Sequence, residues 1–203
     1  MEGALFFLFS RVFSKPPTQE LISKIIENQL LTLASLGSSH SKAQVLEENT
    51  WCEQQEEIEK DYARLFSVPS EVQILPYESY YRDEIPIGFG DWQNFSKIPI
   101  ERGMRGFLGG PTVSKLKQLY ESEGLFHNQD FPDLLDHMGC ELEFLGHLYE
   151  KGDIKCAHRF FNEHLKMWGI DFLKKVEERA QTSFYKTASR SLQLFLKSNE
   201  LFF

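Results

Sequence analysis

Apolar residues in the first third of the chain recur every three or four positions, which is the spacing of one face of an α-helix. A first short helix is expected to end before Lys15-Pro16-Pro17, because a proline pair does not continue a helix. Thr18 can cap a second helix, and a third helix is expected over residues 42–66. The apolar positions of the second helix are Leu21, Ile22, Ile25, Ile26, Leu30 and Leu33.

The same spacing returns in the second half of the chain. We expect a helix over residues 112–123 and another that starts near Asp130 and ends at Lys151-Gly152. A long helix is expected from about Asp153, and a last helix follows it. The apolar positions of the last three helices are, in order, Leu135, Met138, Leu142, Leu145 and Tyr149; Ala157, Phe161, Leu165, Trp168, Phe172 and Val176; and Phe184, Tyr185, Ala188, Leu192 and Phe195.

Between Val68 and Pro111 the helical spacing fades, and prolines alternate with glycines. The segment contains too many aromatic residues for a disordered linker, and ordered loops of this length are usually functional. We therefore predict an all-α fold: a single-domain bundle of about seven to nine helices over residues 1–203, with a long Gly/Pro-rich crossing segment at residues 68–111.

Composition and charge exclude several classes of function and location. A formal charge of −8 argues against binding to a nucleic-acid backbone, which needs clustered Lys and Arg, and suits a basic partner.

Three further features concern the location of the protein. The cysteines Cys52, Cys140 and Cys156 form no C-x-x-C pair, which is typical of reduced thiols in a cytoplasm. The N-terminal apolar run lacks a basic flank and is interrupted by Arg11, so export is not expected. No apolar stretch reaches the roughly 18 residues that a membrane span needs. The expected location is the cytoplasm.

Four short motifs follow one another along the chain. The first comprises Asp61–Pro69 and Leu75–Tyr81, and the second is the segment Tyr120–Leu125. The third is Asp136–Phe144, and the fourth is Phe161–Trp168, which reads F-N-E-H-L-K-M-W. In this order they resemble the TorD/DmsD/NarJ family of redox-enzyme maturation chaperones.

The resemblance implies a non-catalytic, all-helical cytoplasmic chaperone. Such proteins bind the twin-arginine signal peptide, or the apo form, of a molybdenum- or tungsten-containing oxidoreductase subunit and assist its maturation before export. The residues that match the family's binding surface are Tyr62, Leu65, Phe66, Pro76, Tyr77, Glu78, Ser79, Tyr80, Asp136, His137 and Glu141. The chain departs from the family in a longer, more aromatic segment at residues 82–110, and in having Leu134-Leu135 where a proline usually precedes Asp136.

These residue types suit a peptide that carries two guanidinium groups followed by an apolar run. Burying one Leu- or Phe-sized side chain contributes about 1.5–3 kcal/mol, whereas an exposed ion pair contributes roughly 0–1 kcal/mol. Aromatic residues would therefore supply affinity, and Glu78 and Asp136 would supply selectivity. The alternatives are structural: Tyr62, Leu65 and Phe66 would belong to the core, Pro76–Ser79 would form only a turn, and His137 would pair with Glu141 along one helix face.

Functions of other classes fit less well. A helical adaptor for an unrelated protein would keep the same groove without a preference for twin arginines. A metal site could use Asp136, Cys140, Glu143 and His147 along one helix stripe, but no H-E-x-x-H motif supports it. No cofactor is expected; the resemblance allows weak guanine-nucleotide binding, although the chain has no P-loop motif. Monomer and domain-swapped dimer are both left open.

Overall fold

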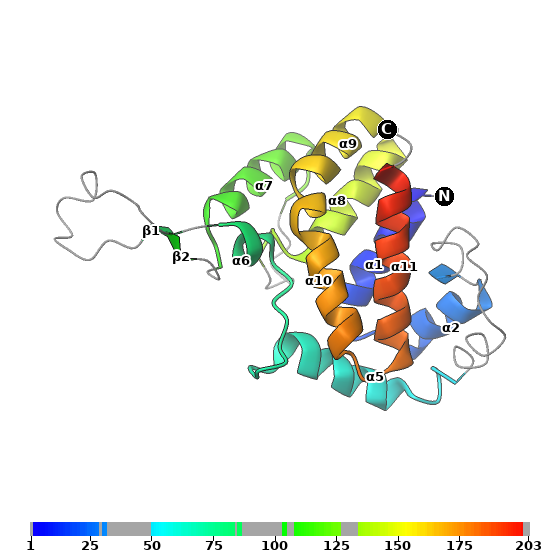
Figure 1. The fold of residues 1–203 in the computed structure, drawn as a ribbon. Helices are drawn as coiled ribbons and strands as arrows, with labels where there is room; N and C mark the ends of the chain where they lie inside the picture. The colour runs from blue at the N-terminus through cyan, green and yellow to red at the C-terminus, as the bar shows by residue number, and fades with distance from the viewer. Residues whose placement is uncertain are drawn as a thin grey trace. The chain divides into compact units, whose positions relative to one another are not determined.

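The computed structural model describes residues 2–28, 30–31, 50–83, 85–86, 103–104, 108–126 and 134–200. The chain forms two compact units (Figure 1). Unit 1 comprises Met1–Pro76 and Met138–Phe203, and unit 2 comprises Tyr77–His137. The all-α prediction is confirmed: within the described ranges, the named strands are two elements of two residues each. The expectation of one domain over residues 1–203 stays a prediction. In the described part of the chain, no helix is long and apolar enough to cross a membrane.

Unit 1 begins with α1 (Glu2–Ser14) and α2 (Gln19–Glu27). The break between them falls at the proline pair, and the Thr18 hydroxyl accepts the Leu21 N–H at 3.3 Å, so both predictions are confirmed. α1 packs closely on α8 (Met138–Lys151) through glycines. A Cβ atom at Gly146 would lie 3.0 Å from the Phe7 ring, so a larger residue there would require that ring to move by a few tenths of an ångström.

The predicted helix over residues 42–66 is only partly observed. Residues 42–49 lie outside the described residues, and residues 50–54 form turns. α5 (Gln55–Tyr62) then continues directly into η1 (Ala63–Ser67), one turn of wider π-helix. The chain returns beside this turn, where the Ile74 N–H donates to the Leu65 carbonyl at 2.7 Å. A π-turn of this kind often marks a functional position.

The C-terminal part of unit 1 corrects two predicted boundaries. The helix expected near Asp130 starts at Met138 instead, because residues 134–137 form a turn and a β-bridge before it. The long helix expected from Asp153 is two helices, α9 (Ile154–Glu163) and α10 (Leu165–Arg179). They are separated at His164, whose backbone has φ −120° and ψ −88°. The last helix is α11 (Ser183–Glu200), which lies beside α10 (Figure 1).

Unit 2 holds α6 (Glu78–Arg82), the antiparallel strands β1 (Ile85–Pro86) and β2 (Gly103–Met104), and α7 (Pro111–Ser122). The segment predicted to be irregular at residues 68–111 therefore contains a helical turn and a strand pair, while residues 87–102 lie outside the described residues. α7 matches the prediction for residues 112–123 to one residue at each end. Asp83 caps α7 by accepting hydrogen bonds from the Thr112 N–H at 3.2 Å and the Thr112 hydroxyl at 2.6 Å.

Candidate functional site

Five of the predicted site residues come together where unit 2 begins and ends. Tyr77 and His137 form an antiparallel β-bridge, and their rings lie 5.3 Å apart at 71°. The Glu78 N–H donates to the Asp136 carbonyl at 3.0 Å. The Ser79 N–H donates to the Asp136 carboxylate at 2.8 Å. We call Tyr77–Ser79 with Asp136–His137 the paired ends of unit 2.

Pro76 and Met138 of unit 1, which flank Tyr77 and His137 in the sequence, are also paired. The Met138 N–H donates to the Pro76 carbonyl at 2.8 Å, which satisfies one of the four N–H groups that the start of α8 leaves open. Pro76 is buried and Met138 is completely buried. The predicted turn at Pro76–Ser79 is thus extended backbone at Tyr77 followed by the first turn of α6.

Asp136 is fully buried, and its two carboxylate oxygens have different surroundings. Oδ2 accepts the Ser79 N–H, while Oδ1 has no hydrogen-bond partner among the described residues. Burial raises the pKa of this carboxyl, and the charge of Glu78 adds to the rise, while the hydrogen bonds from Ser79 oppose it. The paired ends therefore hold an acid that keeps its proton to a higher pH than an ordinary aspartate.

This raised pKa predicts an unusual pH dependence. The folded state keeps the proton of Asp136 after the unfolded chain has lost it, so the free energy of unfolding should fall as pH rises above the ordinary value of 3.8. Asp136→Asn carries no titrating proton and keeps an oxygen for the Ser79 N–H. Urea unfolding of both proteins across the acidic range should show a wild-type-minus-variant difference that declines as pH rises and then levels off. A difference that rises over the same range would contradict the raised pKa.

Glu78 and Arg82 place a second carboxylate beside Asp136. Glu78 is completely buried, and its carboxylate accepts a hydrogen bond from the Arg82 guanidinium one turn further along α6. Arg82 is about one-third exposed, at 32% of its side-chain surface. Tyr77 and Tyr80 are half-buried, and so they are the predicted site residues of unit 2 that offer surface to a ligand.

The three predicted residues on α5 and η1 belong to the aromatic core of unit 1. Leu65 is completely buried, and Tyr62 and Phe66 are each 8% exposed. The Phe66 ring lies 6.2 Å from Phe13, 6.0 Å from Phe172 and 5.8 Å from Tyr185. Their packing matches the structural alternative given above. Contact with a peptide at these positions stays a prediction.

Glu141, the last predicted residue, is completely buried in unit 1. Both of its carboxylate oxygens accept the Trp168 indole N–H, at 3.2 Å each. This pair connects the Asp136–Phe144 motif with the Phe161–Trp168 motif. The arrangement proposed for a metal site is not observed. Asp136 precedes α8, so it does not share a helix stripe with Cys140, Glu143 and His147.

Asp61 is the first residue of the first motif and was not assigned a role from the sequence. It is 2% exposed, and one oxygen accepts the N–H groups of Gln181 and Thr182, at 2.9 and 2.8 Å, and the Thr182 hydroxyl at 2.8 Å. The other oxygen accepts from Arg64 at 2.7 Å. Asp61 therefore anchors the connection between α10 and α11 to α5. Its partners lie 120 residues further along the chain, so no local pattern in the sequence indicates this role.

Comparison with known proteins decides the family. The family model described as "Nitrate reductase delta subunit" matches residues 31–174. The chain belongs to this family. The resemblance to redox-enzyme maturation chaperones drawn from the four motifs is thereby confirmed.

Two relatives of this nitrate reductase delta subunit family member are named "Chaperone protein TorD". The one from Shewanella pealeana is 27% identical over 143 residues, which cover 70% of this chain and 59% of the relative. The one from Colwellia psychrerythraea is 26% identical over 191 residues, which cover 87% of this chain and 80% of the relative. The chain thus spans less than two-thirds of the length of the Shewanella relative.

A solved structure supports the fold of the family member. It is a redox enzyme maturation protein from Archaeoglobus fulgidus, with a TM-score of 0.58 and 23% sequence identity. The match covers 97% of this chain and 94% of the other. In this nitrate reductase delta subunit family member, the motif acids Asp61, Asp136 and Glu141 are buried and hydrogen-bonded, so they hold the backbone and core in place.

Proposed function

We propose that the chain is a non-catalytic cytoplasmic chaperone for a molybdenum- or tungsten-containing oxidoreductase. It binds the twin-arginine signal peptide, or the apo form, of the catalytic subunit and assists its maturation before export. The family match over residues 31–174 carries this proposal, and the relatives named TorD chaperones support it. We also propose that the chain works without a resident cofactor, and that any guanine-nucleotide binding is weak and auxiliary.

The exposure of the site residues suggests a division of labour in unit 2. Tyr77 and Tyr80 offer half-buried rings, which can pack against the apolar run of a signal peptide. The buried acids hold the paired ends, because Glu78 pairs with Arg82 and Asp136 accepts the Ser79 N–H. A peptide arginine approaching Tyr77 or Tyr80 would meet an aromatic face.

The magnitudes favour apolar contacts as the main source of affinity. Micromolar binding needs about −8 kcal/mol after ordering costs. Each buried Leu or Phe of the peptide supplies about 1.5–3 kcal/mol, and an exposed ion pair supplies roughly 0–1 kcal/mol. Loss of apolar residues should therefore weaken binding more than loss of arginines.

Titration calorimetry with a twin-arginine signal peptide tests this proposal. We expect micromolar binding, a large loss with a leucine-depleted peptide and a moderate loss with a Lys-Lys peptide. Tyr80→Ala should weaken binding about tenfold, because one aromatic contact is worth roughly 1–2 kcal/mol. Exposed Lys24→Ala, in unit 1, is the control and should change nothing.

Two outcomes would overturn it. Equal affinity for a scrambled peptide of the same composition would indicate a general helical adaptor. Absence of binding to the signal peptide and to the apo catalytic subunit alike would remove the chaperone proposal.

A further inference from the structure

The C-terminal helices of unit 1 carry a charge opposite to that of the rest of the chain. Residues 154–200 contain nine Lys and Arg against five Asp and Glu, a formal charge of +4. The whole chain carries −8, so the remaining residues carry −12. This asymmetry along the sequence makes the segment that holds α9, α10 and α11 the basic part of an acidic chain.

The asymmetry is sharpest on α11. Between residues 183 and 198, the exposed residues are Lys186, Arg190, Leu194 and Lys197. These positions are four, four and three residues apart, so they form one stripe along the helix, about 16 Å long. We call these four residues the α11 stripe. It presents three cations and one leucine that is 38% exposed, and no acid.

Two of the three cations are available for a ligand. Lys186 and Lys197 have no ion-pair partner within the described residues. Arg190 pairs with Glu177 of α10 at 2.7 Å, and Gln193 donates to the same carboxylate at 2.9 Å. Because Glu177 touches Arg190, the α11 stripe lies directly beside the outer face of α10.

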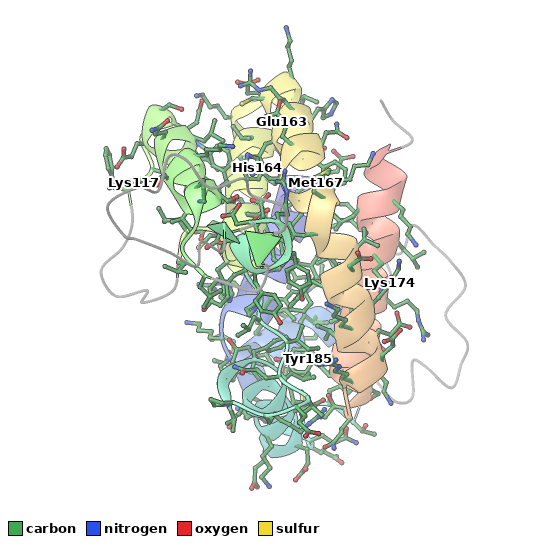
Figure 2. All side chains as sticks on the ribbon, turned by 60° about the vertical axis from the view of Figure 1, so that its left-hand side comes forward. Lys117, Glu163, His164, Met167, Lys174 and Tyr185 are labelled. Carbon is green, nitrogen blue, oxygen red and sulfur yellow. The ribbon has the colours of Figure 1, made fainter. Side chains whose placement is uncertain are left out.

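The outer face of α10 extends the stripe with mixed character. Met167, one of the most exposed apolar side chains described, is 58% exposed, and Lys174 lies two turns further on (Figure 2). Lys174 is 3.5 Å from Asp171, and Glu178 is also exposed, so the charge of this face is nearly balanced. The cationic surface is therefore centred on α11, with an exposed apolar side chain on each helix.

We propose that the α11 stripe binds the surface of an anionic lipid membrane. A lipid surface presents many negative charges at once, together with an apolar layer that Leu194 and Met167 can reach. Each basic side chain near such a surface contributes about fivefold to the partition coefficient.

Other partners fit this surface less well. None of the exposed residues between 154 and 198 is aromatic, so stacking against nucleic-acid bases has no platform there. An acidic protein would form ion pairs of the same strength, each worth at most about fivefold, without a continuous apolar layer that Leu194 and Met167 can reach. Reversible, salt-sensitive lipid binding therefore fits this surface better.

Cosedimentation of the full chain with vesicles tests the proposal. We expect binding to vesicles of phosphatidylcholine mixed with phosphatidylglycerol at low salt, release at high salt, and no binding to pure phosphatidylcholine. Lys186→Gln with Lys197→Gln should lower the partition coefficient about 25-fold, at about fivefold per charge.

The chain offers a matched control. Lys24 of α2 and Lys117 of α7 are each 61% exposed and paired with a glutamate, so Lys24→Gln with Lys117→Gln makes the same change in net charge without altering the α11 stripe. This control should bind within twofold of the wild type. Equal losses in both double variants, or equal binding to neutral vesicles, would overturn the proposal. Salt-sensitive self-association lost in Lys186→Gln/Lys197→Gln, without lipid binding, would assign the stripe to a protein partner and also overturn it.

Discussion

Replacing Asp61 by alanine should lower the free energy of unfolding by about 3–5 kcal/mol, because it removes one partner of a buried, hydrogen-bonded charge cluster. The carboxylate is 2% exposed and accepts hydrogen bonds from the two backbone N–H groups and the hydroxyl at Gln181 and Thr182. Without it, those N–H groups at the start of α11 lose their acceptor. The change corresponds to a fall in melting temperature of about 6–20 °C for a chain of this size.

Three variants make this expectation specific. Asp61→Asn keeps one oxygen acceptor but places an amide donor against other donors, so it should lose an intermediate amount. Arg64→Ala removes the ion pair, whose arginine is 24% exposed, and a hydrogen bond to the Arg179 carbonyl, and should cost less than Asp61→Ala. The control is Asp171→Ala on α10, where the side chain is 71% exposed, and it should stay within about 0.5 kcal/mol of the wild type. A loss below about 1 kcal/mol in Asp61→Ala would show that the cluster does not anchor the α10–α11 connection.

Local chemistry predicted the helix ends that depend on single residues. Thr18 caps α2, as expected from a threonine after a proline pair. Gly124 and Gly152, which follow α7 and α8, have φ of +78°, a conformation that glycine adopts at no steric cost. These signals are contained in a few neighbouring residues, and so the sequence alone is sufficient to find them.

The break at His164 had no such signal. Apolar positions continue at helical spacing from Ala157 through Leu165 to Val176, so the pattern predicts one helix. The backbone nevertheless turns at His164, which is 6% exposed with its ring stacked 4.9 Å from Phe160. Tertiary packing overrode the local helical preference here, and neither glycine nor proline marks the position.

The burial of the acids in the candidate site could not be predicted from the sequence either. The family motifs pointed to five residues that the structure brings together, but the sequence does not show which of its acids are buried. Glu78, Asp136 and Glu141 are all completely buried, although such residues are usually exposed. Each is hydrogen-bonded to a group that only the folded chain brings close, such as the Trp168 indole for Glu141, 27 residues away. The half-buried rings of Tyr77 and Tyr80 thus become the better candidates for direct contact with a peptide.

The contact between Glu141 and Trp168 should be the second large determinant of stability. Trp168 is 1% exposed, and its indole N–H donates to both Glu141 oxygens at 3.2 Å. Trp168→Ala should cost about 3–5 kcal/mol, since it leaves a large cavity and also removes this donor. Trp168→Phe keeps most of the ring volume, so its loss of about 1–3 kcal/mol isolates the missing hydrogen bond to the buried carboxylate.

A double-mutant cycle in urea separates this interaction from its surroundings. Glu141→Leu should also destabilise, because it leaves the buried indole N–H without its acceptor and removes the other contacts of the carboxylate. In Trp168→Phe/Glu141→Leu both partners of the hydrogen bond are gone, so the combined loss should be smaller than the sum of the single losses by about 0.5–3 kcal/mol. Single losses that add within about 0.5 kcal/mol would mean that the two motifs are stabilised independently. A combined loss below that sum would mean instead that the buried hydrogen bond between Glu141 of α8 and Trp168 of α10 couples the Asp136–Phe144 and Phe161–Trp168 motifs energetically.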